Sequence, residues 1–127
     1  MPHISARVLE PQLIGREQEL IAALTDAVVE VYGDWARPIA VVRLVGIPAG
    51  RWGVGGKQVD SVAPAITLGI RESALAGPEG PERASALVTA MTNAVVSVFG
   101  EEIRPGITVD LVTTGPGRSG LGGVIDD

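Results

Sequence analysis

Position 2 holds the residue with the most unusual chemistry, a proline directly after Met1. A small second residue permits removal of Met1, and Pro2 would then present a secondary amine, which no other ordinary residue supplies. An α-amino group has a pKa of about 7.7–8, and an apolar pocket or nearby guanidinium groups lower it toward neutrality. Pro2 is therefore a candidate general base at pH 7. If Met1 is retained, the Pro2 nitrogen is an amide without basicity.

Two arginines are candidate anion-binding residues. Arg43 stands within the aliphatic run VVRLV, where burial of a guanidinium is costly unless a carboxylate or another anion meets it. Its partner is either Asp110 of the same chain or a bound anion, and the pattern leaves both open. Arg71 follows the run ITLGI and precedes Glu72, which by itself favours a solvated surface position.

The composition excludes most other kinds of site. With no Cys and a single His, the chain cannot build a thiolate site, a cysteine nucleophile or a multi-histidine metal centre. His3 is expected to be half exposed, and no carboxylate partner for a Ser/His/Asp triad is evident. The net charge of −5 disfavours nucleic acid and anionic membrane surfaces as partners. The start MPHISARVLE lacks the basic and apolar blocks of a secretory signal, so we expect a cytoplasmic protein.

The chain contains an internal repeat. With a shift of 67 residues, the segment 20–33 (LIAALTDAVVEVYG) matches 87–100 (LVTAMTNAVVSVFG) at eight of fourteen positions. The match extends without a gap from residues 15–56 to residues 82–123, with nineteen identities in 42 positions. We therefore predict one domain over 1–127, made of two repeats at 1–60 and 65–127.

Each repeat has the pattern of a β-α-β unit. An alternating strand (3–9 or 66–70) precedes a helix with an apolar stripe, and a β-branched run follows at 39–47 or 107–113. The glycine-rich ends GRWGVGG and GRSGLGG lack the following helix and basic residue of a phosphate cradle, which favours hairpin turns. Residues 57–64 (KQVDSVAP) are the expected linker. The predicted fold is α+β, with a four-stranded sheet, two helices on one face and a bare opposite face that suits an oligomer interface.

Positions that differ between the copies point to function, because a catalytic site needs to survive only once. An internal copy also has no free terminal amine, so at most one candidate base remains in each chain. Under the shift of 67, the informative pairs are Arg43 with Asp110, Trp52 with Ser119, Pro2 with Gly69 and Arg71 with Ile4.

This ordered set of features resembles the tautomerase superfamily, the small β-α-β proteins with an amino-terminal proline typified by 4-oxalocrotonate tautomerase. The proline, strand, amphipathic helix, VRLV strand and RWGVGG turn match the family's unit in order and spacing, twice over nearly the whole chain. The chain looks like a fused, two-unit member of the kind that includes malonate semialdehyde decarboxylase and cis-3-chloroacrylic acid dehalogenase. The runs PAGRWGVGG and GIRES are especially similar to the dehalogenase.

The resemblance implies a tautomerase/MIF-like fold, no cofactor or metal, and a homotrimer in which a neighbouring chain contributes to the pocket. It also implies roles for four residues: Pro2 as catalytic base, Arg43 as the strand arginine, Trp52 as the aromatic pocket wall and Arg71 as a carboxylate-binding arginine.

The departures from the family pattern reduce the number of reactions that the chain is expected to catalyse. At the position of the second arginine of the short tautomerases, the residue nearest in register is Gln12, and Arg16 matches only with a gap. The residues that activate water in the dehalogenase fall on Val28 and about Arg118, so water activation is not expected.

We therefore predict a cofactor-independent keto–enol tautomerase of a small 2-hydroxydienoate or enolpyruvate-type acid. The alternatives are a decarboxylase or hydratase/dehalogenase of a small three-carbon acid on the same scaffold. If Met1 is retained, the expectation is a catalytically inactive binding or assembly module.

Overall fold

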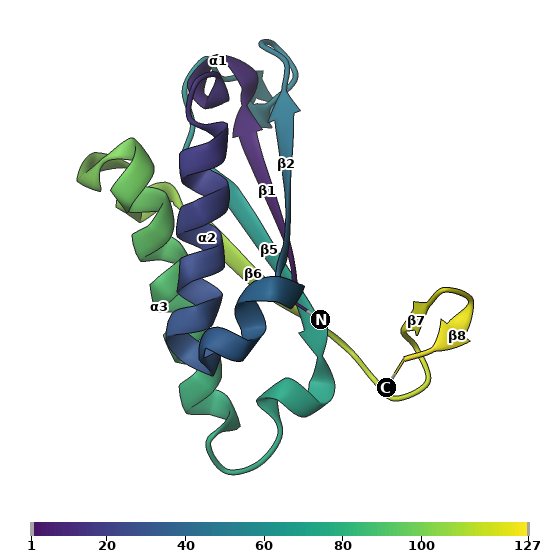
Figure 1. The fold of residues 1–127 in the computed structure, drawn as a ribbon. Helices are drawn as coiled ribbons and strands as arrows, with labels where there is room; N and C mark the ends of the chain where they lie inside the picture. The colour runs from purple at the N-terminus through teal and green to yellow at the C-terminus, as the bar shows by residue number, and fades with distance from the viewer. Residues whose placement is uncertain (1, 127) are drawn as a thin grey trace.

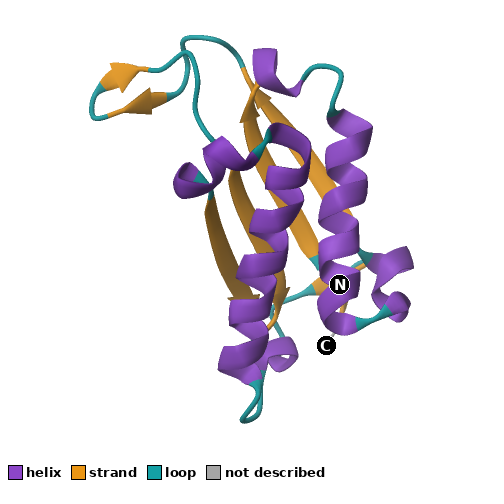
Figure 2. Cartoon of the chain, turned by 90° about the vertical axis from the view of Figure 1, so that its left-hand side faces the viewer, coloured by secondary structure: helices purple, strands orange, loops and turns teal. Residues whose placement is uncertain are grey.

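The structure is a computed structural model that describes residues 2–126, and its centre is a four-stranded sheet with two helices packed on one face (Figure 1, Figure 2). The sheet strands are β1 (His3–Leu9), β2 (Val41–Ile47), β5 (Ala65–Arg71) and β6 (Thr108–Thr114). The covering helices are α2 (Glu17–Tyr32) and α3 (Gly80–Phe99). The predicted fold class is confirmed.

The strand order is β2-β1-β5-β6, with β1 parallel to β2, β5 parallel to β6, and β1 antiparallel to β5. Each parallel pair is therefore one β-α-β unit, and the antiparallel contact joins the two units. The predicted apolar stripes face the sheet: Leu20 and Leu24 of α2 and Leu87 and Met91 of α3 are fully buried. None of the helices within residues 2–126 is long and apolar enough to span a bilayer.

Short elements connect and extend these two units. They are α1 (Glu10–Leu13), the 3₁₀ helices η1 (Asp34–Ile39), η2 (Glu72–Leu75) and η3 (Glu101–Gly106), and the hairpin strands β3 (Gly53–Val54), β4 (Lys57–Gln58), β7 (Gly120–Leu121) and β8 (Val124–Ile125).

The glycine-rich ends form hairpins, as predicted. The central residues Gly55 and Gly56 have φ of 60° and 81°, which is the conformation that a two-residue turn with two positive φ values requires. The linker prediction is wrong at its start, because Lys57 and Gln58 pair with β3 and belong to the first hairpin.

The register of the opening strands corrects the sequence alignment. His3 pairs with Val41, whereas Ala65 pairs with Thr108, so β1 and β5 correspond with a shift of 62, although the later segments keep 67. The second unit therefore carries five additional residues between its opening strand and its helix. The counterpart of Pro2 is thus Pro64, also buried, and not Gly69. By the same shift, the counterpart of Arg71 is Leu9 and not Ile4.

Candidate active site

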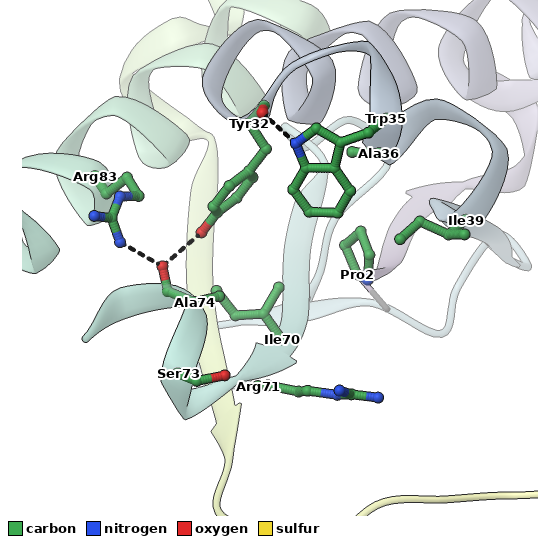
Figure 3. Close-up of a pocket in the computed structure, with 10 residues that line it drawn as sticks. All are labelled: Pro2, Tyr32, Trp35, Ala36, Ile39, Ile70, Arg71, Ser73, Ala74 and Arg83. Atoms are coloured by element: carbon green, nitrogen blue, oxygen red, sulfur yellow. Dashed lines mark hydrogen bonds between the residues drawn. The ribbon is translucent and has the colours of Figure 1, made fainter. Parts of the chain in front are cut away.

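A cavity of about 500 Å³ lies at the end of the sheet where β1 begins and β5 ends. These two strands are antiparallel neighbours, so the start of one lies beside the end of the other. Pro2 and Arg71 consequently line the same cavity, although 69 positions separate them in the sequence (Figure 3). The predicted base and one of the predicted arginines are therefore brought together within a single chain.

Pro2 is buried, and its ring lies beside Ile39 and Trp35 in the close-up view (Figure 3). Its carbonyl oxygen accepts a hydrogen bond of 3.0 Å from the backbone N–H of Val41, which extends the pairing of β1 with β2 by one residue. This bond fixes where the pyrrolidine ring stands relative to the cavity.

Aromatic residues from the end of α2 and from η1 form one wall. Tyr32 and Trp35 lie edge to face with ring centroids 6.2 Å apart, and the Trp35 indole N–H donates to the Tyr32 carbonyl at 2.6 Å. Ile39 and Ile70 continue this wall. The space next to Pro2 is therefore mainly apolar, although the Trp35 side of it is open to solvent.

The segment with the five additional residues closes another side. The carbonyl oxygen of Ala74 accepts one hydrogen bond from the Tyr32 hydroxyl at 3.1 Å and one from Arg83 Nη1 at 2.8 Å. Burial raises the pKa of Tyr32, with the nearby Arg83 charge acting in the opposite direction. The hydroxyl therefore stays protonated near neutral pH and can donate to Ala74.

Arg71 supplies positive charge at the base of the cavity. Its Nη2 lies 2.8 Å from Asp126 Oδ2, and the two side chains are 31% and 38% exposed. Its Nε is buried and has no hydrogen-bond partner in the described part of the chain. The ion pair thus holds Arg71 in place while one of its donors is unused. The expected solvated position next to Glu72 is only partly correct, because the side chain is partly exposed but also paired with Asp126.

Arg43 lies outside this cavity. Val42 and Leu44 pack against the core, so the intervening Arg43 projects from the opposite, open face of the sheet, where its Nη1 lies 3.2 Å from His3 Nδ1. Desolvation, with the Arg43 charge second, lowers the pKa of His3.

The ion pair of Arg43 with Asp110 does not form within the chain. The two residues lie on the outer strands β2 and β6, with β1 and β5 between them. The register places Arg43, Ser5, Thr67 and Asp110 in one row across the sheet. The two opposite charges therefore stand at the same level on opposite edges.

Trp52 and the uncertain positions Gln12 and Arg16 lie at the other end of the sheet. Trp52 directly precedes β3 and is half-buried there, because β2 runs away from the Pro2 end. Gln12 Oε1 accepts from the backbone N–H of Val62, and the Arg16 guanidinium lies 5.4 Å from the centre of the Phe99 ring. Any role of these residues at a Pro2 site requires a second copy of the chain.

Four residues at this site were not predicted from the sequence: Trp35, Tyr32, Arg83 and Asp126. Arg83 could not be singled out, because it matches Arg16 in the repeat and so looks structural. Trp35 and Tyr32 differ from their counterparts Glu102 and Phe99, and these two differences were available signals. Among residues 2–126, no group of three or more His, Cys, Asp or Glu side chains is placed to hold a metal ion.

Comparison with solved structures decides the fold. F6, a wild-type fused 4-OT solved as an asymmetric trimer, superposes with a TM-score of 0.82 at 20% identity, covering 97% of this chain and 94% of its own. The chain has the fused 4-OT tautomerase fold. Pt0534, solved after inactivation by 2-oxo-3-pentynoate, shares this fused 4-OT fold with a TM-score of 0.81 at 19% identity, over 98% of this chain and 94% of that one.

A solved structure with a lower TM-score and lower identity also has this fold. N1, a member of the cis-3-chloroacrylic acid dehalogenase family, gives a TM-score of 0.72 at 16% identity, over 98% of this chain and 83% of its own. No protein-family model matches the sequence, and neither does any curated protein. The fused 4-OT fold is thus shared at low sequence identity.

Proposed function

We propose that the protein is a cofactor-independent keto–enol tautomerase of a small 2-hydroxydienoate or enolpyruvate-type acid. The observation that carries the proposal is the position of a buried Pro2 and the Arg71 guanidinium in one mainly apolar cavity. The proposal takes Met1 to be removed, so that the Pro2 nitrogen is a free secondary amine.

Pro2 acts as the general acid–base group in this proposal. The apolar wall formed by Trp35, Ile39 and Ile70 and the positive charge of Arg71 both disfavour the protonated amine, so its pKa is expected to fall toward neutrality. The free amine takes the enol hydroxyl proton, and the resulting ammonium returns a proton to carbon. Because the proton is exchanged between one amine and the substrate, no metal or cofactor is required.

Arg71 holds the substrate carboxylate and stabilises the negative charge that develops on the dienolate. Its guanidinium suits this role, because Nε has no partner among residues 2–126 and Nη2 is paired only with the partly exposed Asp126. The apolar wall of the cavity packs against the substrate's carbon chain. These two elements orient the acid with its oxygenated end toward Pro2.

Arg43 and Trp52 are proposed to join the site from a neighbouring copy in a homotrimer. Within one chain, Arg43 projects from the open sheet face, and Trp52 lies at the opposite end from Pro2. A fused 4-OT of the same fold forms a trimer, which supports assembly of this kind. The exposed Val45 and Val112 on the open face provide apolar surface for it.

The test combines mass and rate measurements. Intact mass of the protein from its native source should lack the mass of Met1, and the processed protein should ketonise phenylenolpyruvate or 2-hydroxymuconate. Pro2→Ala, which replaces the secondary amine by a primary one, should lower kcat strongly, by up to the roughly 10²–10⁴-fold that general acid–base catalysis contributes.

The matched control is Pro64→Ala, which alters the structural counterpart of Pro2 but no terminal amine. A control variant with near wild-type rates and an impaired Pro2→Ala variant would support the proposal. Retention of Met1 in an active protein, or unchanged rates in Pro2→Ala, would remove proline from the mechanism.

A further inference from the structure

The second hairpin places an acidic side chain on the carboxylate-binding arginine. The hairpin of β7 and β8 projects from the body of the protein, and the described chain ends beside it at Asp126 (Figure 1). The Asp126 N–H donates to the Ser119 carbonyl at 2.8 Å, which fixes the residue to the base of the hairpin. The Asp126 carboxylate then reaches Arg71 Nη2 at 2.8 Å.

The ion pair with Asp126 uses only one of the two donors on one edge of the Arg71 guanidinium. Nε and Nη2 of an arginine are parallel donors, and a well-placed carboxylate accepts from both of them. Asp126 accepts from Nη2 alone, and Nε is buried and has no partner among residues 2–126. An unpaired buried donor is unfavourable, so a carboxylate that displaces Asp126 and accepts from both atoms is favoured at this edge.

The hairpin is also poorly anchored by apolar packing. Leu121, Val124 and Ile125 are all exposed, so burial of these side chains against the body does not hold the hairpin down. A second cavity of about 320 Å³ lies between the hairpin and the sheet and includes both Arg71 and Asp126 in its lining. Arg71 therefore borders both this space and the Pro2 cavity.

We propose that Asp126 is an internal competitor, which occupies the Arg71 carboxylate site until a planar carboxylate ligand takes both Nε and Nη2. The ligand class is a small carboxylic acid with an unhindered, planar carboxylate and an apolar body. Asp126 thereby selects for carboxylates with bidentate geometry, because a ligand with one acceptor gains nothing over the residue it displaces. This inference deepens the proposed function and rests on its assignment of Arg71.

The experiment measures binding of benzoate, which offers a planar carboxylate and an apolar ring but has no enol to convert. The dissociation constant is measured by NMR titration of the full chain, as wild type, Asp126→Asn and Asp26→Asn. Asp26→Asn is the matched control, since it changes net charge equally and removes an exposed Asp–Arg pair whose aspartate lines neither cavity.

Asp126→Asn should bind benzoate about two- to fivefold more tightly, the range for loss of a partly exposed ion pair. Asp26→Asn should match the wild type, and affinity for the neutral benzamide should not change in either variant. Arg71→Ala should lose benzoate binding and with it the effect of Asp126→Asn.

Weaker or unchanged benzoate binding in Asp126→Asn would overturn the inference, since it would make Asp126 a positioning partner of Arg71 or a bystander. A wild type that binds no benzoate would overturn it too. The readout is independent of turnover, so loss of the Pro2 mechanism and loss of the competitor are separate results.

Discussion

Replacement of Arg71 by alanine tests the proposed site most directly. A carboxylate loses a charge-assisted contact in Arg71→Ala, and one such hydrogen bond contributes about 1.5–3 kcal/mol. In the wild type, the ligand must first displace Asp126, and a pair 31% and 38% exposed offsets up to about 1 kcal/mol of that gain. The expected net loss is about 1–2 kcal/mol, or about 5- to 30-fold in kcat/KM.

The assay follows the loss of enol absorbance of phenylenolpyruvate and compares the acid with its methyl ester. Arg71→Ala should slow the acid more than the ester, because both lose the dienolate stabilisation but only the acid has a carboxylate for Arg71 to bind. Arg104→Ala is the control, since it removes an exposed arginine that is paired with Glu101 in η3, outside the cavity. Equal losses for acid and ester, or an Arg104→Ala variant as slow as Arg71→Ala, would refute the carboxylate assignment.

Three further predictions concern the cavity wall and the open face. Trp35→Ala should lower kcat/KM for aryl substrates about two- to tenfold, the range of one aromatic contact, while Trp35→Phe retains most of it, measured in the same assay. The pKa of His3, read from NMR titration of the single histidine, should lie below 6.5 and rise in Arg43→Gln, because loss of a positive charge eases protonation; no rise would contradict the assigned cause. Arg43→Asp should weaken the proposed homotrimer in light scattering, and added Asp110→Arg should restore it if the two edge strands meet between copies. An Arg43 that only binds substrate predicts no such rescue.

Much of the fold was predictable because it depends on local pattern. The alternating strands, the helix stripes around Leu24 and Met91 and the glycine pairs of the hairpins are each readable within a short window. Because the repeat aligns without a gap, the elements predicted for one unit also apply to the other, which implies a sheet with two covering helices. The ungapped alignment is wrong only for the opening strands, because the second unit has five additional residues between its opening strand and its helix.

The candidate site was predictable only in part. Pro2 and Arg71 were singled out from residue type and from resemblance, and the structure places them in one cavity. Trp52 and Arg43 lie outside it, because the direction of β2 and the alternation of side chains along that strand carry them to another end and another face. Asp126 was overlooked because nothing in the sequence near the hairpin signals that its carboxylate reaches Arg71.

The sequence by itself determined the two β-α-β units and their apolar faces, since these follow from hydrophobic periodicity and glycine placement along short stretches of chain. Only the tertiary structure decided which end of which strand meets which loop. The antiparallel join of β1 to β5 brings Pro2 beside Arg71, and the five additional residues after β5 carry Ala74 to Tyr32 and Arg83. These contacts depend on register between segments far apart in sequence, which local composition does not specify.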